Sequence, residues 1–351
     1  MKRIAVIGAG LFGLSTAFVL SKKYKIDIFE KENDILKGVS GSNQLRFHLG
    51  YHYPRAARTI REVQKNNKDF IKFYGKNIFG KTNNYYGVSK NDSKTSFTNY
   101  INFLKKYKLK YKNFNLNELS SIEGSILSDE MNLNIFSIKK KILFMLKKSK
   151  KRINLFLNSA FRKEQLNIYH KVIIATYENN NEILKKLGIK PKKKFKYELV
   201  EKTIIKIPSK FKSKSYMIID GKFLCIDPFL GTKFHLLSSN KYSKIEIKEG
   251  YFPNFKSKKK IYINKGIINN QKLSGFKKFI KHGKLYFKFI KHAKYIGSFY
   301  LVRVIERNKE NTDDRLNKVD FVNKKVITLL SGKWNTSISV AKDLYNKINN
   351  K

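Results

Sequence analysis

Three glycines near the start of the chain constrain its fold more than any other feature. Gly8, Gly10 and Gly13 follow the apolar run Arg3–Ile7 with the spacing Gly-x-Gly-x-x-Gly, and they open the apolar segment at residues 11–21. A pattern of this kind between a strand and a helix is typical of a dinucleotide-binding βαβ unit. The first glycine permits a tight turn, the second lets the backbone approach a pyrophosphate, and the third allows close packing of helix on strand. The sequence therefore predicts a Rossmann-like start.

An acidic residue closes the second predicted strand of this unit. Glu30 follows the run Lys25–Phe29 and lies 22 positions after Gly8. At that spacing a carboxylate can accept hydrogen bonds from ribose hydroxyls, while the pyrophosphate sits at the helix N-terminus. The alternative is a solvated acid at a strand end, and these residues alone do not decide between FAD and NAD. The predicted cofactor-binding residues of this unit are Gly8, Ala9, Gly10, Leu11, Phe12, Gly13, Glu30 and Lys31.

Chain length and cysteine content limit the class of protein to which the chain can belong. With 351 residues and 41% hydrophobic content, the chain is long enough for two folded domains. A single cysteine, Cys225, excludes an intramolecular disulfide and is expected to be a buried, inert thiol in a reducing compartment. The basic start followed by an apolar run superficially resembles a secretory signal, but glycines interrupt the run and no small-residue cleavage site follows. We expect a cytoplasmic protein without a membrane span.

The formal charge of +49 is extreme, and taken alone it would favour nucleic acid or an anionic membrane as a partner. Only ten of the 75 basic residues are arginine, and lysine is spread through nearly every segment. Nucleic-acid-binding proteins generally concentrate their charge on one face and favour arginine. The distribution therefore indicates compositional bias, and no specific nucleic-acid partner is expected.

The spacing of apolar residues predicts the remaining elements. Helices are expected around residues 60–74, 97–107, 138–145 and 338–348, and strands around residues 154–157, 172–175 and 326–330. Residues 194–300 hold short β-branched and aromatic runs, which predict an antiparallel sheet. The expected fold is α/β, a Rossmann-like dinucleotide-binding domain interleaved with an α+β substrate domain built on the antiparallel sheet. The predicted segments are 1–80, 126–188 and 300–351 for the first domain, and 81–125 and 189–299 for the second.

Three further blocks accompany the glycine fingerprint. Residues 38–44 read Gly-Val-Ser-Gly-Ser-Asn-Gln, residues 171–176 read Lys-Val-Ile-Ile-Ala-Thr, and residues 312–315 read Thr-Asp-Asp-Arg. In these blocks the chain resembles the D-amino acid oxidase-like family of FAD-dependent oxidoreductases. They are similar to the family's loop along the pyrophosphate, its strand ending in Ala-Thr-Gly, and its acidic turn before the last cofactor-contacting strand. Tyr177 stands where that glycine is usual.

This resemblance implies FAD as the cofactor and adds contact residues. Ser40, Asn43 and Gln44 would lie along the pyrophosphate and approach the flavin, and Thr176 would end the contacting strand. The chain departs from the family at residues 331–336, where relatives carry a glycine-rich stretch and this sequence reads Ser-Gly-Lys-Trp-Asn-Thr. Gly332 and Lys333 are predicted cofactor contacts, because a lysine and a helix N-terminus would stabilise an anionic reduced flavin. An ordinary loop lysine is the alternative.

Arginine, histidine and tyrosine concentrate in one segment. Residues 46–61 hold four of the ten arginines and two of the six histidines. In a chain that otherwise uses lysine, retained arginines suggest places where a planar, bidentate donor is needed. A second arginine group comprises Arg303, Arg307 and Arg315. The candidate catalytic residues are His48 and His52 as bases, Arg46, Arg55 and Arg303 as anchors for a substrate's anionic group, and Tyr53 as a wall or hydroxyl donor. No metal ligand set is found.

These observations predict an enzyme that oxidises a small amine or 2-hydroxy acid by hydride transfer to flavin N5. A hairpin at residues 220–229 is expected to face the open side of the flavin. Two alternatives stay open: a flavin-dependent tRNA-modifying enzyme, and a protein that binds a nucleotide without turnover. Substrate identity, electron acceptor and oligomeric state are not predicted.

Overall fold

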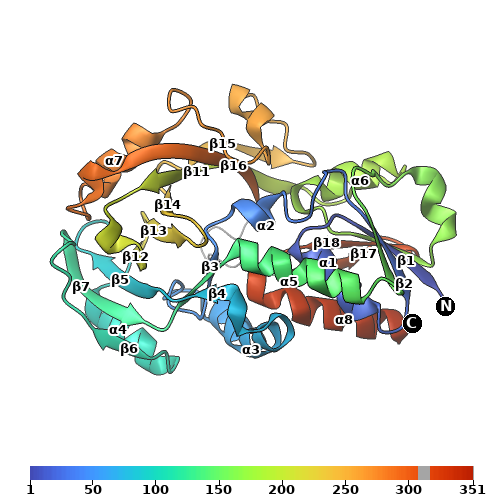
Figure 1. Ribbon diagram of the computed structural model, residues 1–351, viewed down its shortest axis with the longest axis horizontal. Helices are drawn as coiled ribbons and strands as arrows, with labels where there is room; N and C mark the ends of the chain where they lie inside the picture. The colour runs from blue at the N-terminus through green and yellow to red at the C-terminus, as the bar shows by residue number, and fades with distance from the viewer. Residues whose placement is uncertain (307–316, 351) are drawn as a thin grey trace.

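The computed structural model of the chain describes residues 1–306 and 317–350. Within these residues the strands form one sheet of six, one of nine and one of three. The six-stranded and nine-stranded sheets lie in opposite halves of the molecule, and the small sheet lies near the middle (Figure 1). The predicted α/β fold, with a Rossmann-like half and an antiparallel half, is confirmed.

The six-stranded sheet is built around the first strand of the chain. Its order is β17-β18-β10-β1-β2-β9, and every neighbouring pair is parallel except β17 with β18. The central strands are almost wholly apolar and buried on both faces, as a parallel sheet covered by helices requires. The strands are β1 (Arg3–Ile7), β2 (Lys25–Phe29), β9 (Ile153–Phe156), β10 (Lys171–Ile174), β17 (Lys318–Phe321) and β18 (Val326–Leu330).

Helices cover this sheet and form the main core with it. All ten residues of α1 (Leu11–Leu20) are buried, and α1 packs against α8 (Ser337–Asn349), so the end of the chain returns to its beginning. In Figure 1, α1, α5 (Ile135–Lys148) and α8 lie together over the half that contains β1 and β2. The short helix α6 (Asn180–Lys186) follows β10.

The nine-stranded sheet is antiparallel except for the pairing of β12 with β5. Its two longest strands, β11 (Phe195–Lys206) and β16 (Lys294–Glu306), pair along their whole length. The other strands are β5 (Asn83–Ser89), β6 (Tyr111–Asn113), β7 (Ile122–Ser128), β12 (Lys214–Ile219), β13 (Leu224–Phe229), β14 (Phe234–Ser239) and β15 (Lys244–Gly250). The predicted domain boundaries stay a prediction, and β7 and β16 run across two of them within this one sheet.

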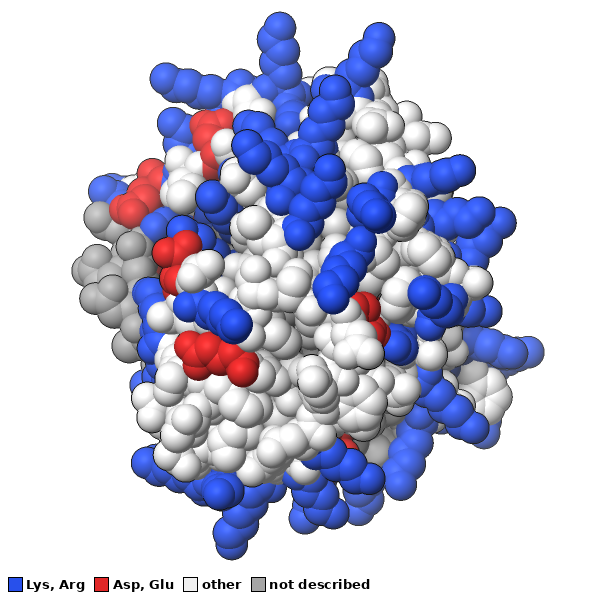
Figure 2. Space-filling model, turned by 90° about the vertical axis from the view of Figure 1, so that its left-hand side faces the viewer, with Lys and Arg blue, Asp and Glu red and all other residues white. Residues whose placement is uncertain are grey.

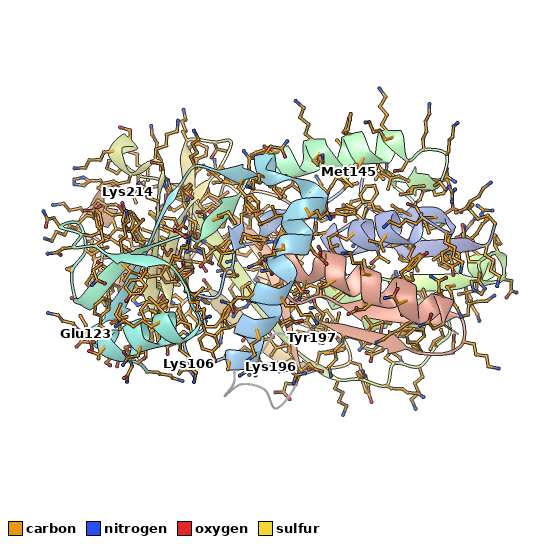
Figure 3. All side chains as sticks on the ribbon, turned by 90° about the horizontal axis from the view of Figure 1, so that it is seen from below. Lys106, Glu123, Met145, Lys196, Tyr197 and Lys214 are labelled. Carbon is orange, nitrogen blue, oxygen red and sulfur yellow. The ribbon has the colours of Figure 1, made fainter. Side chains whose placement is uncertain are left out.

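A small sheet and a long helix connect the two halves. The strands β3 (Arg46–Phe47), β8 (Met131–Leu133) and β4 (Phe79–Gly80) pair in that order. Residues 37–53 contain β3 and the short helix α2 (Val39–Ser42), and the pairing of β3 with β8 has no signal in the local sequence. Seen from below, α3 (Ala57–Tyr74) passes between the half that carries Lys214 and the half that carries Met145 (Figure 3).

The remaining helices are short. The helices α4 (Phe97–Lys106) and α7 (Phe276–Gly283) pack on the nine-stranded sheet. Single 3₁₀ turns occur at Lys76–Ile78, Lys163–Ile168, Tyr177–Asn179, Ser209–Phe211, Lys258–Tyr262, Ile290–His292 and Trp334–Thr336. In residues 1–306 and 317–350, no helix combines the length and apolar character needed to cross a membrane.

Lysine and arginine side chains are scattered over the surface. On the face formed by the end of the nine-stranded half, they surround uncharged areas and alternate with a few acidic groups (Figure 2). Sticks drawn for every side chain show lysines extending outward from both halves (Figure 3). The positive charge on these views is thus distributed rather than gathered into one stripe.

Candidate functional site

A cavity of about 400 Å³ lies where the two halves meet. Its walls come from the glycine turn, the α2 loop, the end of β10 and the segment before α8 on one side, and from the nine-stranded sheet on the other. Three residues on the sheet side illustrate this, since Met217, Cys225 and Ser238 stand on the neighbouring strands β12, β13 and β14. The cavity therefore joins the predicted cofactor site to the predicted substrate domain.

The glycine turn fits a dinucleotide. Gly8 has a φ of +103°, which only glycine adopts without strain, and a Cβ there would lie 2.9 Å from the carbonyl oxygen of Ala175. A Cβ on Gly13 would lie 2.0 Å from the carbonyl oxygen of Gly8, so the helix could not pack as closely with any other residue. Gly10, Leu11 and Phe12 line the cavity at the N-terminus of α1. The turn thus leaves space beside free helix N–H groups, as a pyrophosphate requires.

Glu30 is held in place to receive a ribose. Its carboxylate accepts the backbone N–H of Ala9 at 2.8 Å through Oε2 and that of Glu32 at 3.0 Å through Oε1, and it lines the cavity. Each carboxylate oxygen has further acceptor capacity, which ribose hydroxyls can use. The side chain of Lys31 is exposed, lies 3.7 Å from Glu32 and is not part of the cavity lining, so its contact with a cofactor stays a prediction.

The loop predicted to follow the pyrophosphate lies beside the glycine turn. The hydroxyl of Ser40 accepts the backbone N–H of Leu11 at 3.0 Å, at the N-terminus of α1. Asn43 lines the cavity and fixes the loop by donating to the carbonyl of Val39 at 2.9 Å. Gln44 also lines the cavity and reaches across to the nine-stranded sheet, where it donates to Asp227 at 2.7 Å.

The end of β10 explains a departure from the family pattern. Tyr177 has a φ of +57°, in the left-handed region that glycine adopts most easily, although its side chain is bulky. Its hydroxyl accepts the backbone N–H of Val304 at 3.0 Å, which ties this turn to β16. Thr176 lines the cavity, and its N–H and hydroxyl donate to Asn180 at 2.9 Å and 3.0 Å.

The segment before α8 also lines the cavity. Gly332 donates its N–H to Asn317 at 2.8 Å, and the ammonium of Lys333 lies 4.6 Å from the centre of the Tyr53 ring. The side chain of Asn335 donates to the carbonyl of His48 at 2.9 Å. The C-terminal segment and the histidine-containing loop are therefore linked directly.

The three arginines predicted as anchors line the cavity, and each has an acidic partner. Arg46 is 3% exposed, forms an ion pair with Asp227, and donates to Ser215 at 2.6 Å. Burial opposes its charge, but the attraction of Asp227 raises the pKa of the guanidinium. Arg303 pairs with Glu198, which also faces Lys244 at 3.2 Å.

Arg55 forms the third of these pairs, with Asp220 in the turn after β12. Both residues line the cavity. Phe223 of the same predicted hairpin lines it too, so the turn faces the cavity as the sequence indicates. Arg307 and Arg315 lie outside the described residues, as does the predicted acidic turn at residues 312–315.

The two candidate bases are neighbours. The rings of His48 and His52 lie 5.3 Å apart and both line the cavity. The Nδ1 atom of His48 lies 3.0 Å from Oε1 of Glu130, and His52 stacks on Phe223 at 4.6 Å. Tyr53 packs edge-on against both histidines, at 5.4 Å and 5.1 Å. No group of three His, Cys, Asp or Glu side chains suited to a metal ion occurs in residues 1–306 and 317–350.

Several residues at the site were not predicted from the sequence. Glu130, Asp227 and Lys202 are ionisable residues in or behind the cavity, and Lys202 donates to Gln44 at 2.9 Å. An isolated acid or lysine between strands gives no local signal of its partner, and only Asp227 lay in a segment that the sequence had indicated. Burial raises the pKa of Cys225 to about 12, so this cavity-lining thiol stays protonated at neutral pH.

Comparison with known proteins gives a family match over the first third of the chain and a shared fold along its length. Residues 3–109 match the family model of FAD dependent oxidoreductases called DAO. A segment of 58 residues is 40% identical to the FAD-dependent monooxygenase kojA of Aspergillus flavus, and covers 16% of this chain and 14% of that protein. A segment of 98 residues is 29% identical to the FAD-dependent monooxygenase FPY4 of Fusarium mangiferae, and covers 28% of this chain and 27% of that protein. The matches thus span about a quarter or less of the curated relatives' lengths.

Solved structures resemble the whole chain. Glycine oxidase from Geobacillus kaustophilus superposes with a TM-score of 0.70 at 11% identity, covering 100% of this chain and 96% of that one. L-proline dehydrogenase from P. horikoshii gives a TM-score of 0.70 at 13% identity, with 99% and 93% covered. L-amino acid deaminase from Proteus vulgaris gives 0.67 at 11% identity, with 100% and 94% covered. The fold is shared along almost the full length of each chain.

Proposed function

We propose that the chain, which matches the family model of FAD dependent oxidoreductases over residues 3–109, oxidises a small carboxylate-bearing amine, such as an amino acid. One observation carries the proposal: a single cavity connects the dinucleotide turn to a chamber with two adjacent histidines and several cations. The solved structures of the same fold include a glycine oxidase, a proline dehydrogenase and an amino acid deaminase, which supports an amino acid as the substrate class. A 2-hydroxy acid is the alternative within the same chemistry.

The charge of the cavity lining favours an anion. Three acidic residues line it, namely Glu30, Glu178 and Asp220. The cations that line it are Lys37, Arg46, Arg55, Lys202, Arg303 and Lys333. An excess of cations suits the pyrophosphate of FAD at one end and a substrate carboxylate at the other, because both are anions that a lysine or arginine can bind.

The residues that would hold FAD are those around the glycine turn. Its pyrophosphate would meet the N-terminus of α1 and Ser40, and its ribose would meet Glu30. When bound, FAD supplies the acceptor for the hydride that leaves the substrate's C–H bond. The predicted contacts Asn43, Gln44, Thr176, Gly332 and Lys333 all line the same cavity and are proposed to contact the cofactor.

The chain's own side chains would bind the substrate and move its proton. Arg55 and Lys202 stand on opposite walls, one before α3 and one on β11, and are proposed to bind the carboxylate. His48 is proposed to take the proton that a substrate ammonium or hydroxyl must lose, because its ring faces the cavity and imidazole titrates near neutral pH. His52 and Tyr53 complete the wall beside it.

The test is anaerobic mixing of the FAD-loaded protein with amino acids, N-methyl amino acids and 2-hydroxy acids, followed by flavin absorbance. Reduction by at least one compound, in a protein that releases FAD on denaturation, is the expected result. A protein that is colourless and cannot be reconstituted would contradict FAD binding. Retained FAD with no reduction by any compound would contradict the oxidation and favour a nucleotide-binding role without turnover.

A further inference from the structure

A buried carboxyl lies directly behind the proposed base. Glu130 stands between β7 and β8 and is 3% exposed. Its Oε1 faces Nδ1 of His48 at 3.0 Å, and its Oε2 accepts the hydroxyl of Tyr86 at 2.9 Å. The side chain of His48 is itself 18% exposed and lines the cavity. One edge of the imidazole is thus held by a buried acid, and the ring borders the space for the substrate.

A buried arginine lies between two buried carboxyl groups behind His48. The guanidinium of Arg46 donates to the hydroxyl of Tyr86 at 3.2 Å and forms an ion pair with Asp227, which is 0% exposed. One buried cation therefore faces two buried carboxyls, Asp227 and Glu130. A buried charge without a counterion is costly, so the network favours either a protonated Glu130 or a positive charge on His48.

The groups around the pair are consistent with this balance. Glu130 is surrounded by Tyr86, Arg46 and His48, with Asp227, Tyr51 and Tyr100 farther out. Burial raises the pKa of Glu130 to about 7, although Arg46 and the Tyr86 hydrogen bond act in the opposite direction.

On its other sides, His48 faces His52 and Tyr53, and the ammonium of Lys333 lies over the Tyr53 ring. Glu130 contacts the His48 ring directly at 3.0 Å, so its carboxylate is placed to stabilise a proton that arrives on the ring.

We propose that Glu130 is the positioning residue for His48, and that it fixes the ring proton on Nδ1 and stabilises the imidazolium formed when Nε2 takes a proton from the substrate. A carboxylate that accepts from Nδ1–H leaves Nε2 as the proton acceptor, which is the way an acid orients a catalytic histidine. The proton leaves the substrate ammonium or hydroxyl, resides on Nε2, and later passes to solvent. The inference rests on the proposed function, and it adds to it the group that sets the basicity of His48.

The first test needs no substrate. In protein labelled with ¹³C at the histidine Cε1 positions, the His48 signal is identified by its loss in His48→Gln and then titrated in the FAD-loaded protein. Glu130→Gln keeps the shape of the side chain but removes its charge, so His48 should titrate at lower pH, by about one unit or more. An unchanged His48 titration would overturn the proposal, whether or not the protein oxidises an amino acid.

The second test measures flavin reduction at saturating substrate against pH. Glu130→Gln should slow reduction by about ten- to a hundredfold, and the acidic limb of the profile should move to lower pH while FAD stays bound. In a His48→Gln background the same change should have little further effect, because Glu130 acts through His48. Full additivity of the two changes, or a loss of stability with an unmoved limb, would show a merely structural role.

A further variant keeps the proposal testable if Glu130→Gln does not fold. Tyr86→Phe removes one hydrogen bond that favours the carboxylate form of Glu130 and leaves its charge in place. The pair should then hold its proton more tightly, so the His48 titration and the acidic limb should both move to higher pH. A shift of both to lower pH, or no shift in either, would contradict the proposed coupling.

Discussion

The guanidinium of Arg55 donates to both carboxylate oxygens of Asp220, from Nε at 2.6 Å and from Nη2 at 3.2 Å. Arg55 precedes α3 and Asp220 lies in the turn after β12, so this pair connects the two walls of the cavity. The side chain of Asp220 is 1% exposed and that of Arg55 is 31% exposed. The arginine is thus positioned by a buried acid while part of it remains accessible from the cavity.

We expect Arg55→Lys to weaken substrate binding more than FAD binding. Lysine keeps the charge but loses the two-pronged geometry that holds the cation against Asp220. The substrate concentration for half-maximal flavin reduction should rise about tenfold, equivalent to about 1.4 kcal/mol. Stopped-flow flavin reduction measures this, with Arg58→Lys on the exposed side of α3 as the matched control. Equal effects of both changes would show that Arg55 has no part in substrate binding.

Short-range patterns predicted the first half of the site well. The strands at Arg3–Ile7, Lys25–Phe29 and Val326–Leu330 have the bounds read from the sequence, because an apolar run between polar or glycine residues is a local signal. The glycine turn and Glu30 line one cavity for the same reason, since their spacing is fixed within one βαβ unit.

Long-range pairings could not be predicted in this way. Arg46 was proposed as an anchor for a substrate, and the structure places it in an ion pair with Asp227, 181 positions along the chain. No local pattern selects that acid from the other acids of the chain. The contact between His48 and Glu130 depends likewise on the pairing of β3 with β8, which two short strands do not reveal.

Substitutions at two glycines of the turn should have different effects, one on FAD binding and one on the stability of the fold. Gly10 has a φ of −72°, which any residue adopts, and a Cβ there would meet only the Ser40 hydroxyl at 3.3 Å. Gly10→Leu should therefore fold, with a thermal midpoint of the FAD-free protein within a few degrees of the original, yet lose FAD, because the side chain fills the space beside the helix N-terminus. Retention of FAD by Gly10→Leu would contradict the proposed position of the pyrophosphate.

Gly13→Ala is the contrasting change. The added Cβ would lie 2.0 Å from the carbonyl oxygen of Gly8, and backbone cannot move aside without disturbing β1 and α1. Overpacking of this kind costs about 1 to 3 kcal/mol, so the FAD-free protein itself should unfold at lower temperature. Thermal unfolding of both FAD-free variants, followed by circular dichroism, separates the two effects.

The hydroxyl of Tyr177 should offset the cost of this residue's left-handed backbone conformation. The left-handed conformation at φ +57° costs about 1 to 2 kcal/mol for a non-glycine residue. Tyr177→Phe keeps this strain and leaves the N–H of buried Val304 without the hydroxyl that it reaches at 3.0 Å. We expect a loss of about 1 to 2 kcal/mol in the free energy of unfolding, measured in urea. Tyr177→Gly relieves the strain but removes the whole ring, so a large gain in stability for Gly would contradict this account.

Lys202 is expected to contribute to binding of the substrate carboxylate. Its ammonium lies 2.9 Å from Oε1 of Gln44 and 3.5 Å from the hydroxyl of Ser238, on the wall formed by the nine-stranded sheet. Lys202→Met keeps much of the side-chain length and removes the charge, so carboxylate ligands should bind about tenfold more weakly while FAD is retained. Titration of the flavin spectrum with a non-reacting carboxylate measures this. Lys206→Met, at an exposed position on the same strand, is the control, and an equal loss there would contradict a specific role.

The raised pKa of Glu130 should also appear in the stability of the protein. Burial raises this pKa to about 7, whereas an unfolded glutamate titrates near 4.3. Between these values the folded protein binds more protons than the unfolded chain, so this group's contribution to stability is present at pH 4 and falls as the pH rises through 7. The whole shift corresponds to about 4 kcal/mol.

Glu130→Gln removes that pH dependence, and the comparison of the two proteins measures it together with the coupled shift of His48. His235 and His282 act in the opposite direction, because burial lowers the pKa of each to about 4, and their contribution is lost on acidification from about 6.5. Both proteins contain these histidines, so their effect cancels in the difference. Urea unfolding at pH 5 and pH 8 should show the variant gaining stability relative to the original protein at the higher pH. If the difference in unfolding free energy between the two proteins is the same at pH 5 and pH 8, the Glu130 carboxyl is already ionised in the folded protein at pH 5.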